Sequence, residues 1–400
     1  MSPFFSTFLV AALGYFVDVY DLVLFGVVRI ESLKAIGVPE ERLLSDGMWL
    51  MDCQMIGMLV GGLFWGYLAD RKGRTTVMMA SILLYSLANL ANAFVGSVSV
   101  YAMLRFLAGL GLAGEVGAAV TLISESSQQT NRTLWTTLLT CFGLMGAVAA
   151  GIVGDWLHWK AAYLLGGGMG LGLLVLRLRV AESSLFTDSN ASRLARPDFL
   201  FRTRQRFVRF VSCVLLGVPI WYVVGILVSF SPEIMKERGL LEPISTGRAI
   251  LLCYVGFCLG DLVTGMVSHL LRNRKKVIAG ALLGLAMMVS IYLSASIETL
   301  RSFEVLCVVL GFFGGYWAVY ITTVSENFGT NLRGAAVIMT TNGMRGAVVL
   351  MTLGVQFLRQ YGSLVQSTAI LGGIVIGAAF LALLALPETF GKDLNYLEGA

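Results

Sequence analysis

Twelve long apolar stretches constrain the fold of this chain more than any other feature. About 20 apolar residues are enough to cross a bilayer as a helix. The stretches are too long and too uniformly apolar for the alternating strands of a membrane barrel, so each is predicted to be a transmembrane helix. They cover residues 5–28, 48–69, 76–95, 98–123, 133–154, 161–180, 207–231, 247–270, 277–296, 301–324, 334–357 and 364–386. The sequence therefore predicts an all-α membrane protein with twelve transmembrane helices.

The composition excludes a soluble alternative. Hydrophobic residues make up 57% of the 400 residues, and charged residues make up 13%, about half the roughly 25% that soluble domains carry. The net charge of +5 comes from basic residues spread over short connections, so no nucleic-acid partner is expected. The six cysteines all lie in apolar stretches without paired spacing, and packing between helices explains them best. The lipid bilayer is the expected surrounding.

The distribution of Lys and Arg predicts the orientation of the chain. With the N-terminus inside, the inner connections and tails carry 18 basic residues and the outer connections carry nine, including Arg29. Cytoplasmic connections carry the excess of basic residues in membrane proteins. Both termini are therefore expected in the cytoplasm, in a plasma membrane such as the inner membrane of a bacterium.

The two halves of the chain repeat each other. Glu125 precedes Arg132 by seven residues, and Glu326 precedes Arg333 by the same spacing 201 positions later. The predicted organisation is a six-helix bundle over residues 1–180, a cytoplasmic linker over 181–206, and a second six-helix bundle over 207–400. Two pseudo-symmetric six-helix halves are the architecture in which a central site opens alternately to each side.

The connection after the second helix carries a motif, which runs from Gly66 through Asp70 to Arg74. Asp70 can lie beside the N-terminal end of another helix, where a carboxylate is favoured. Arg74 can pair with an acid on a neighbouring helix end, for which Glu125 is well placed. This motif resembles the signature loop of the major facilitator superfamily, and the resemblance covers the whole chain. It implies a charge lock formed by Gly66, Asp70, Arg74, Glu125, Glu326 and Arg333.

Other segments narrow the resemblance within that superfamily. The stretch from Arg105 to Glu115, with Gly109, Gly111 and Gly114 between them, is similar to one shared by metabolite:proton, phosphate:proton and sugar-type symporters. The segment Pro387-Glu388-Thr389 resembles the tail that these families carry after the last helix. The second copy of the loop motif departs from the pattern, because His269 stands where the aspartate belongs, and this puts the charge lock of that half in doubt.

Two motifs of other protein classes are discarded. The glycines at 109, 111 and 114 spell a dinucleotide fingerprint, but no strand precedes them, and close helix packing explains them better. The sequence has no P-loop motif. No cofactor and no metal site are expected, and without a nucleophile–base motif the chain is not expected to be an enzyme.

Ionisable residues inside a membrane cost roughly 2.5–3.5 kcal/mol each on insertion scales, so each requires a partner or a function. Asp18 and Asp21 share one face of the first helix, and Glu115 lies ten residues after Arg105 in the fourth. A carboxylate beside an arginine stays ionised until the arginine is drawn away, and it then takes a proton. The resemblance implies this partnership for Asp18 and Arg105. A permanent ion pair between helices is the alternative.

Several residues of the second half are candidates for substrate contact. Arg345 in the eleventh helix can bind a carboxylate or phosphate in bidentate fashion, although it could instead neutralise Asp261. Asn342 lies one turn from Arg345. Tyr222, close to the helix-interrupting Pro219, and Trp317 in the tenth helix could line the cavity. Together with Arg105, these residues form the predicted substrate site: Arg345, Asn342, Tyr222 and Trp317.

The predicted function is secondary active transport, in which a monomer imports a small polar metabolite with protons by alternating access. Arginines beside acids favour an organic acid or an amino acid as the substrate. The fifth helix has glycines but lacks the Gly-Pro pair frequent in antiporters of this superfamily, which mildly favours symport or uniport. The alternatives are a phosphate, sugar or nucleoside transporter, a proton-independent facilitator or exporter, and a sensor that does not transport.

Overall fold

The computed structural model describes residues 3–72, 74–114, 132–181, 202–240, 242–294, 297, 299–329 and 332–391. Every regular element in these ranges is helical. Ten helices are long and apolar enough to cross a membrane, and Thr76–Asn92 and Val98–Leu112 are shorter apolar helices. The predicted all-α class with twelve membrane helices is confirmed.

The chain forms two compact units, Met1–Arg193 and Leu194–Ala400, which we call the N-terminal and the C-terminal unit. The boundary falls within the predicted linker, of which residues 182–201 lie outside the described residues. The helices of the N-terminal unit are α1 (Pro3–Ala35), η1 (Glu40–Arg42), α2 (Leu43–Lys72), α3 (Arg74–Asn92), α4 (Val98–Leu112), α6 (Arg132–Trp156) and α7 (Trp159–Ala181).

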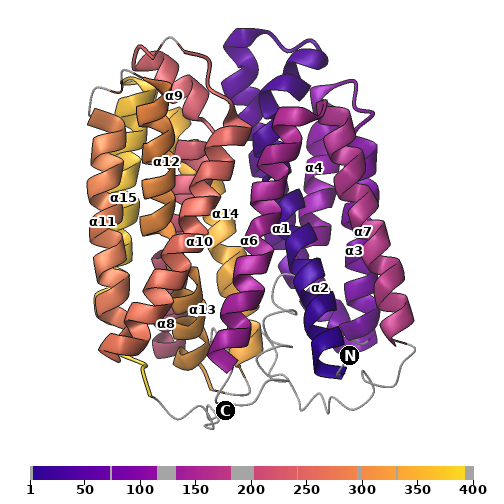
Figure 1. The fold of residues 1–400 in the computed structure, drawn as a ribbon, viewed down its shortest axis with the longest axis vertical. Helices are drawn as coiled ribbons and strands as arrows, with labels where there is room; N and C mark the ends of the chain where they lie inside the picture. The colour runs from indigo at the N-terminus through magenta and orange to yellow at the C-terminus, as the bar shows by residue number, and fades with distance from the viewer. Residues whose placement is uncertain are drawn as a thin grey trace. The chain divides into compact units, whose positions relative to one another are not determined.

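The C-terminal unit contains two irregular spans (Figure 1). Its helices are α8 (Arg204–Trp221), the π-helical η4 (Tyr222–Val228), α9 (Ser231–Glu237), α10 (Thr246–Leu271), α11 (Arg274–Ser294), α12 (Leu300–Gly314), α13 (Trp317–Asn327), α14 (Arg333–Leu358) and α15 (Leu364–Ala385). The predicted span 207–231 is thus part α-helix and part π-helix, and the predicted span 301–324 is broken between α12 and α13.

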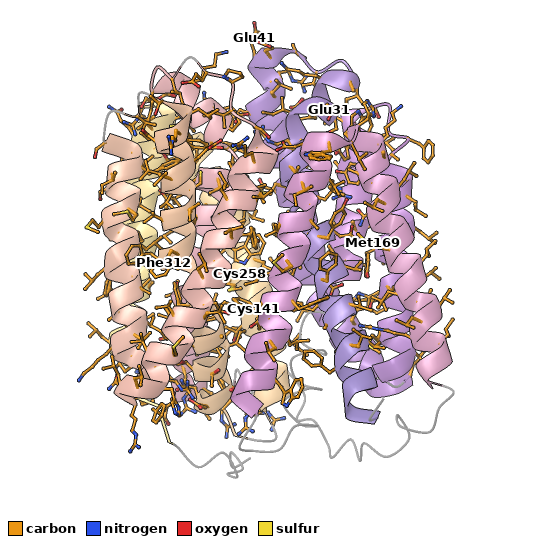
Figure 2. The ribbon with its side chains drawn as sticks, in the orientation of Figure 1. Glu31, Glu41, Cys141, Met169, Cys258 and Phe312 are labelled. Carbon is orange, nitrogen blue, oxygen red and sulfur yellow. The ribbon has the colours of Figure 1, made fainter. Side chains whose placement is uncertain are left out.

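The break in the second of these spans lies well inside the unit. Phe312, in the last turn of α12, lies about halfway along the helices of the C-terminal unit (Figure 2). Gly315 and Tyr316 separate the two helices. Non-helical backbone at membrane depth is tolerated only where protein or a cavity satisfies its polar groups. The partners of this break are therefore informative.

Glycines bring pairs of helices into direct backbone contact in the same way in both units. A Cβ atom on Gly57 would clash with the carbonyl of Phe106, and one on Gly109 would clash with that of Gln54, at the crossing of α2 and α4. The crossing of α10 and α12 repeats this pattern, with Gly256 against Val308 and Gly311 against Cys253. Small residues allow such close approach of membrane helices. The packing interpretation of the glycines at 109, 111 and 114 agrees with this arrangement.

The end of α1 differs from the sequence-based expectation. Arg29 was counted in an outer connection, but α1 continues to Ala35. The Arg29 side chain is completely buried, and its Nη1 donates to the carbonyl of Leu43 at 3.1 Å. A buried arginine near a helix end looks like a loop residue in a hydropathy pattern, because the pattern does not show which groups it can bond.

Candidate functional site

The buried arginine of the N-terminal unit is Arg105 on α4. Its side chain has no exposed surface, and its Nη2 donates to Oδ1 of Asn89 on α3 at 2.6 Å. The guanidinium carbon lies 5.0 Å from the ring centre of Tyr163 and 5.9 Å from that of Phe25. Nε and Nη1 have no hydrogen-bond partner among the described residues. The guanidinium is therefore held by one neutral oxygen and by two aromatic rings.

A chain of hydroxyl groups begins at the same tyrosine. The hydroxyls of Tyr163 and Tyr101 lie 2.6 Å apart, and Tyr101 lies 3.1 Å from the hydroxyl of Ser32 near the end of α1. All three side chains are completely buried. Because buried hydroxyls that bond one another fix each other's rotamers, this chain holds the Tyr163 ring beside the guanidinium of Arg105.

The two carboxylates of α1 are buried in the same unit. Asp18 is 3% exposed, and Asp21 has no exposed surface. Gly166 on α7 lies against the Asp21 carboxylate and the ring of Tyr20, so a Cβ atom there would clash with the carboxylate. Gly166 stands one turn after Tyr163, whose ring lies beside Arg105. Asp21 and Arg105 thus both lie near the same turn of α7, and the predicted partnership of Asp18 with Arg105 stays a prediction.

Five predicted site residues of this unit have side chains outside the description. Glu115 and Glu125 lie outside the described residues. Gly66 and Asp70 belong to α2, and Arg74 begins α3, but the side chains at these positions are likewise outside the description. Their roles remain predictions.

The buried arginine of the C-terminal unit is Arg345 on α14. It is 3% exposed, and its guanidinium carbon lies 5.7 Å from the ring centre of Trp221 at the end of α8. Asn342, one turn earlier, is also 3% exposed. Neither polar atom of the Asn342 side chain has a hydrogen-bond partner within the described part of the chain. A buried amide with both ends unused is costly unless a ligand or water bonds it.

Two aromatic side chains belong to α13, which packs against the helix of this arginine. Trp317 and Tyr320 have ring centres 5.6 Å apart, and the Tyr320 hydroxyl lies against Gly217 of α8. The sulfur of Met344, the residue before Arg345, lies against the same glycine. The Trp317 Nε1 and the Tyr320 hydroxyl, both buried, have no hydrogen-bond partner among the residues described. These groups are available to a polar ligand.

Tyr222, a predicted substrate contact, has a different environment. It is completely buried in η4, and its hydroxyl donates to the carbonyl of Thr368 on α15 at 2.7 Å. A Cβ atom on Gly372 would lie 2.5 Å from the same hydroxyl. In this structure Tyr222 joins two helices, and its hydroxyl is already committed to that bond.

Asp261, considered as a counter-charge for Arg345, bonds the start of α13. It is completely buried on α10, and its Oδ1 accepts the backbone N–H of Ala318 at 2.6 Å, in the first turn of α13. Unpaired N–H groups at a helix start favour a carboxylate. The sequence showed an acid near a loop, but it gave no sign of a helix start opposite that acid.

The C-terminal unit contains an ion pair of the kind expected for the charge lock. Arg274 at the start of α11 pairs with Glu326 in two parallel contacts, Nε to Oε2 at 2.6 Å and Nη2 to Oε1 at 2.7 Å. Arg333 donates through Nε to the carbonyl of Ser325 at 2.9 Å. The pair forms although His269 stands where the aspartate was expected. The centre of the His269 ring lies 6.5 Å from that of the Phe390 ring.

The Pro-Glu-Thr segment after the last helix caps α11. The Glu388 carboxylate accepts the backbone N–H groups of Arg274 at 3.1 Å, Lys275 at 3.0 Å, and Thr389 and Phe390 at 2.9 Å. Partial burial alone would raise the pKa of Glu388, but these four hydrogen bonds outweigh it and hold the pKa below its ordinary value. Lys275 also donates through Nζ to the carbonyl of Leu386 at 2.6 Å.

Asn89 is the residue of the arginine site that the sequence analysis missed. It lies in α3 with Asn92 one turn later, and both side chains are completely buried. Two amides one turn apart in an apolar span are a usable signal, because an uncharged polar group at membrane depth also requires a partner. As for metals, no three His, Cys, Asp or Glu side chains in the described ranges are placed to hold an ion.

Helices that repeat in two units, each with a buried arginine at an intramembrane polar cluster, define a polytopic membrane protein of the transporter type. Residues 4–352 match the family model described as Major Facilitator Superfamily, and the chain belongs to this superfamily.

Curated relatives and a solved structure agree with this assignment. The chain is 24% identical to the niacin transporter NiaP of Acinetobacter baylyi, over 96% of this chain and 94% of that protein. It is 37% identical to the 4-hydroxybenzoate transporter PcaK of Pseudomonas aeruginosa over 34% and 32% of the two chains. Further relatives are named as cis,cis-muconate and gallate transporters. The inward-open structure of the xylose transporter XylE from E. coli matches with a TM-score of 0.72 at 18% identity, over 98% of each chain.

The predictions of a multi-pass membrane protein, of a transporter and of a protein that is not an enzyme are confirmed by this family membership and by these relatives.

Proposed function

We propose that the protein imports an organic acid together with protons, by alternating access, and that the preferred substrates are planar carboxylates. Arg105 carries this proposal. Its guanidinium is desolvated and bonded to a neutral amide oxygen, while Nε and Nη1 have no hydrogen-bond partner among the described residues. Such a group gains most from a carboxylate, which accepts charge-assisted hydrogen bonds from two of its N–H groups.

The surroundings of Arg105 favour a flat substrate. The rings of Tyr163 and Phe25 lie beside the guanidinium, and aromatic side chains pack well against another planar ring. The names of two relatives, niacin and 4-hydroxybenzoate transporters, are consistent with a ring that bears one carboxylate.

The carboxylates of α1 would couple substrate to protons. Asp18 and Asp21 are buried, and a buried carboxylate remains ionised only while a positive charge compensates it. A substrate anion that engages Arg105 takes over that compensation, and a carboxylate of α1 then binds a proton. Proton and anion would move inward together. The solved relative XylE is described as a proton:xylose symporter, which supports coupling of this kind in this fold.

The C-terminal unit would bind the part of the substrate other than its carboxylate. Arg345, Asn342 and Trp317 offer donors and acceptors that are buried and next to aromatic rings. A ring nitrogen or a ring hydroxyl could accept from or donate to the Asn342 amide. We further propose that the protein acts as a monomer. We also propose that both termini lie in the cytoplasm, and the twofold excess of basic residues in the inner connections supports this orientation.

The test is uptake into liposomes that contain the purified protein. Labelled nicotinate and 4-hydroxybenzoate are supplied outside, with the outside more acidic by about one pH unit, which can drive about tenfold accumulation when one proton accompanies each anion. Because weak acids also cross bare lipid, protein-free liposomes set the background. We expect saturable uptake above that background, abolished when the pH gradient is collapsed. Uptake that ignores the gradient would contradict coupling, and uptake of xylose or phosphate in place of the acids would contradict the substrate class.

A further inference from the structure

The break between α12 and α13 leaves backbone groups without helical partners. The two helices are separated by Gly315 and Tyr316. The carbonyl of Gly315 and the N–H of Ala318 lie on opposite sides of the break, and an ordinary helix would bond both within the span. Inside a membrane protein such groups must be bonded by neighbouring helices.

One helix, α10, bonds both sides of the break. Asp261 accepts the N–H of Ala318 at 2.6 Å, and the hydroxyl of Thr264 donates to the carbonyl of Gly315 at 2.9 Å. Asp261 and Thr264 are three residues apart and share one face of α10. The two side chains therefore act together at the break.

The rest of α10 is fixed to α12. Gly260 packs against the carbonyl of Phe312, and a Cβ atom on Gly315 would lie 2.5 Å from the carbonyl of Phe257 and 2.9 Å from the nitrogen of Asp261. These contacts hold the backbones of α10 and α12 against each other up to the break. The break is therefore the point at which α13 leaves this helix pair.

The helix beyond the break carries an aromatic pair and packs against α14. Trp317 is the first residue of α13, and Tyr320 follows one turn later. A shift of the α13 start would move both rings relative to α14, which carries Arg345 and Asn342. Because hydrogen-bond geometry at a ligand is sensitive to displacements of about 1 Å, small shifts matter for affinity.

We infer that Asp261, assisted by Thr264, is a positioning residue that sets the affinity for substrate through α13. This inference rests on the proposed function. A carboxylate suits the role because it accepts an N–H at a helix start, where the helix dipole also favours negative charge. Asp261 touches the break and does not itself contact substrate.

The test compares substitutions that remove or keep the acceptor. Asp261→Ala removes it, and Asp261→Asn keeps a side-chain oxygen for the N–H of Ala318. Loss of a buried hydrogen bond to a charged group has effects of about tenfold or more. We expect Asp261→Ala to raise KM for the transported acid about tenfold with kcat reduced less than threefold, and Asp261→Asn to restore KM to within about threefold of wild type.

A second variant guards against misfolding of the first. Thr264→Val keeps the side-chain shape and removes the hydroxyl that bonds Gly315, and we expect it to raise KM about threefold. The matched control is Thr322→Val. The hydroxyl of Thr322 bonds the carbonyl of Ala318 within α13 at 2.7 Å, away from α10, so KM should stay at the wild-type value.

The outcomes separate this inference from the proposed function. If the wild-type protein transports no organic acid, the proposed function fails. If it transports the acid and Asp261→Ala or Thr264→Val leaves KM unchanged, the positioning role alone is wrong. It is also wrong if Asp261→Asn is as impaired in KM as Asp261→Ala, because the acceptor would then not be the feature that matters.

Discussion

The two units place a buried arginine in different scaffolds. Arg105 lies on α4, whose glycines contact the backbone of α2. The Arg105 side chain donates to Asn89 of α3. Arg345 lies on α14, next to the end of α8, where the π-helical η4 begins, and α14 also packs against α13, the helix after the break. The described part of the first site is built on regular helices. The second is built beside two departures from regular helix.

Under the proposed function, we expect this difference to give the two sites different parts in recognition. A guanidinium held by one amide and two rings has a fixed direction, which suits a carboxylate of constant geometry. Irregular backbone can adjust more easily, because its hydrogen bonds are made by side chains such as Asp261. We expect the N-terminal unit to define the charge of the substrate and the C-terminal unit to define its remaining shape.

The largest expected effect concerns Arg105. Arg105→Lys keeps the charge but loses the planar fork, so we expect kcat/KM for acid uptake to fall about 100-fold. The comparison predicts a smaller fall, about tenfold, for Arg345→Lys. The matched control is Arg29→Lys, which replaces another buried guanidinium of the same unit. Because Arg29 bonds the backbone of Leu43, the KM of this variant should equal that of the wild-type protein. Equal losses for Arg105→Lys and Arg345→Lys would remove the proposed division.

A smaller effect is expected at Asn89. Asn89→Ala removes the neutral acceptor of Arg105 and lets the guanidinium turn, and we expect KM to rise about tenfold. Asn92→Ala is the control, since the amide of Asn92 donates to the carbonyl of Ala88 within α3 at 2.7 Å. Uptake kinetics of both variants, measured at several substrate concentrations, distinguish a local role from general damage to α3. A KM raised equally by both would argue against orientation of Arg105 by Asn89.

The third prediction concerns the ring beside Arg345. Trp221→Leu removes the contact between the guanidinium and the indole at 5.7 Å. Such contacts contribute about 0.5–2 kcal/mol, and we expect a rise in KM of about fivefold in the uptake assay. Substitution of Trp156, whose side chain is largely exposed, serves as the control. An unchanged KM in Trp221→Leu would show that Arg345 does not depend on this ring.

The smallest effect lies outside both sites and is one of stability. The hydrogen bonds to Glu388 hold its pKa below the ordinary value, so its stabilising contribution is complete above that ordinary value, about 4.3, and is lost as the pH falls through the lowered pKa. Glu388→Gln should therefore lower the thermal unfolding temperature at pH 7, with a loss of about 1 kcal/mol. The difference from wild type should shrink only as the pH falls below about 4. A difference that grows on acidification would contradict the capping role.

The sequence predicted the spans better than the bonding between them. Apolar length placed α10, α14 and α15 within a few residues of their observed ends, because bilayer thickness fixes that length. It did not predict the break after Gly314, since the pattern stays apolar through Tyr316.

Among the site residues, too, the sequence predicted the buried charges better than their bonding partners. Arg105 and Arg345 were found because a buried charge is conspicuous in an apolar stretch. The partners of Tyr222 and Glu388 lie 146 and 114 residues away in the chain, and sequence spacing does not reveal contacts of that range. Asn89 lies only 16 residues from Arg105 and was missed because an uncharged amide is less conspicuous in an apolar stretch than a charge.

The cap on α11 has a consequence for biosynthesis. Glu388 lies 114 residues after the Arg274 N–H that it accepts, so α12, α13, α14 and α15 must all be synthesised before the cap can form. Until then, the start of α11 has to rely on water or lipid headgroups for its exposed N–H groups. Bonds made by Glu388 thus stabilise a helix synthesised long before, and a ribosome stalled ahead of Glu388 would leave α11 without this cap.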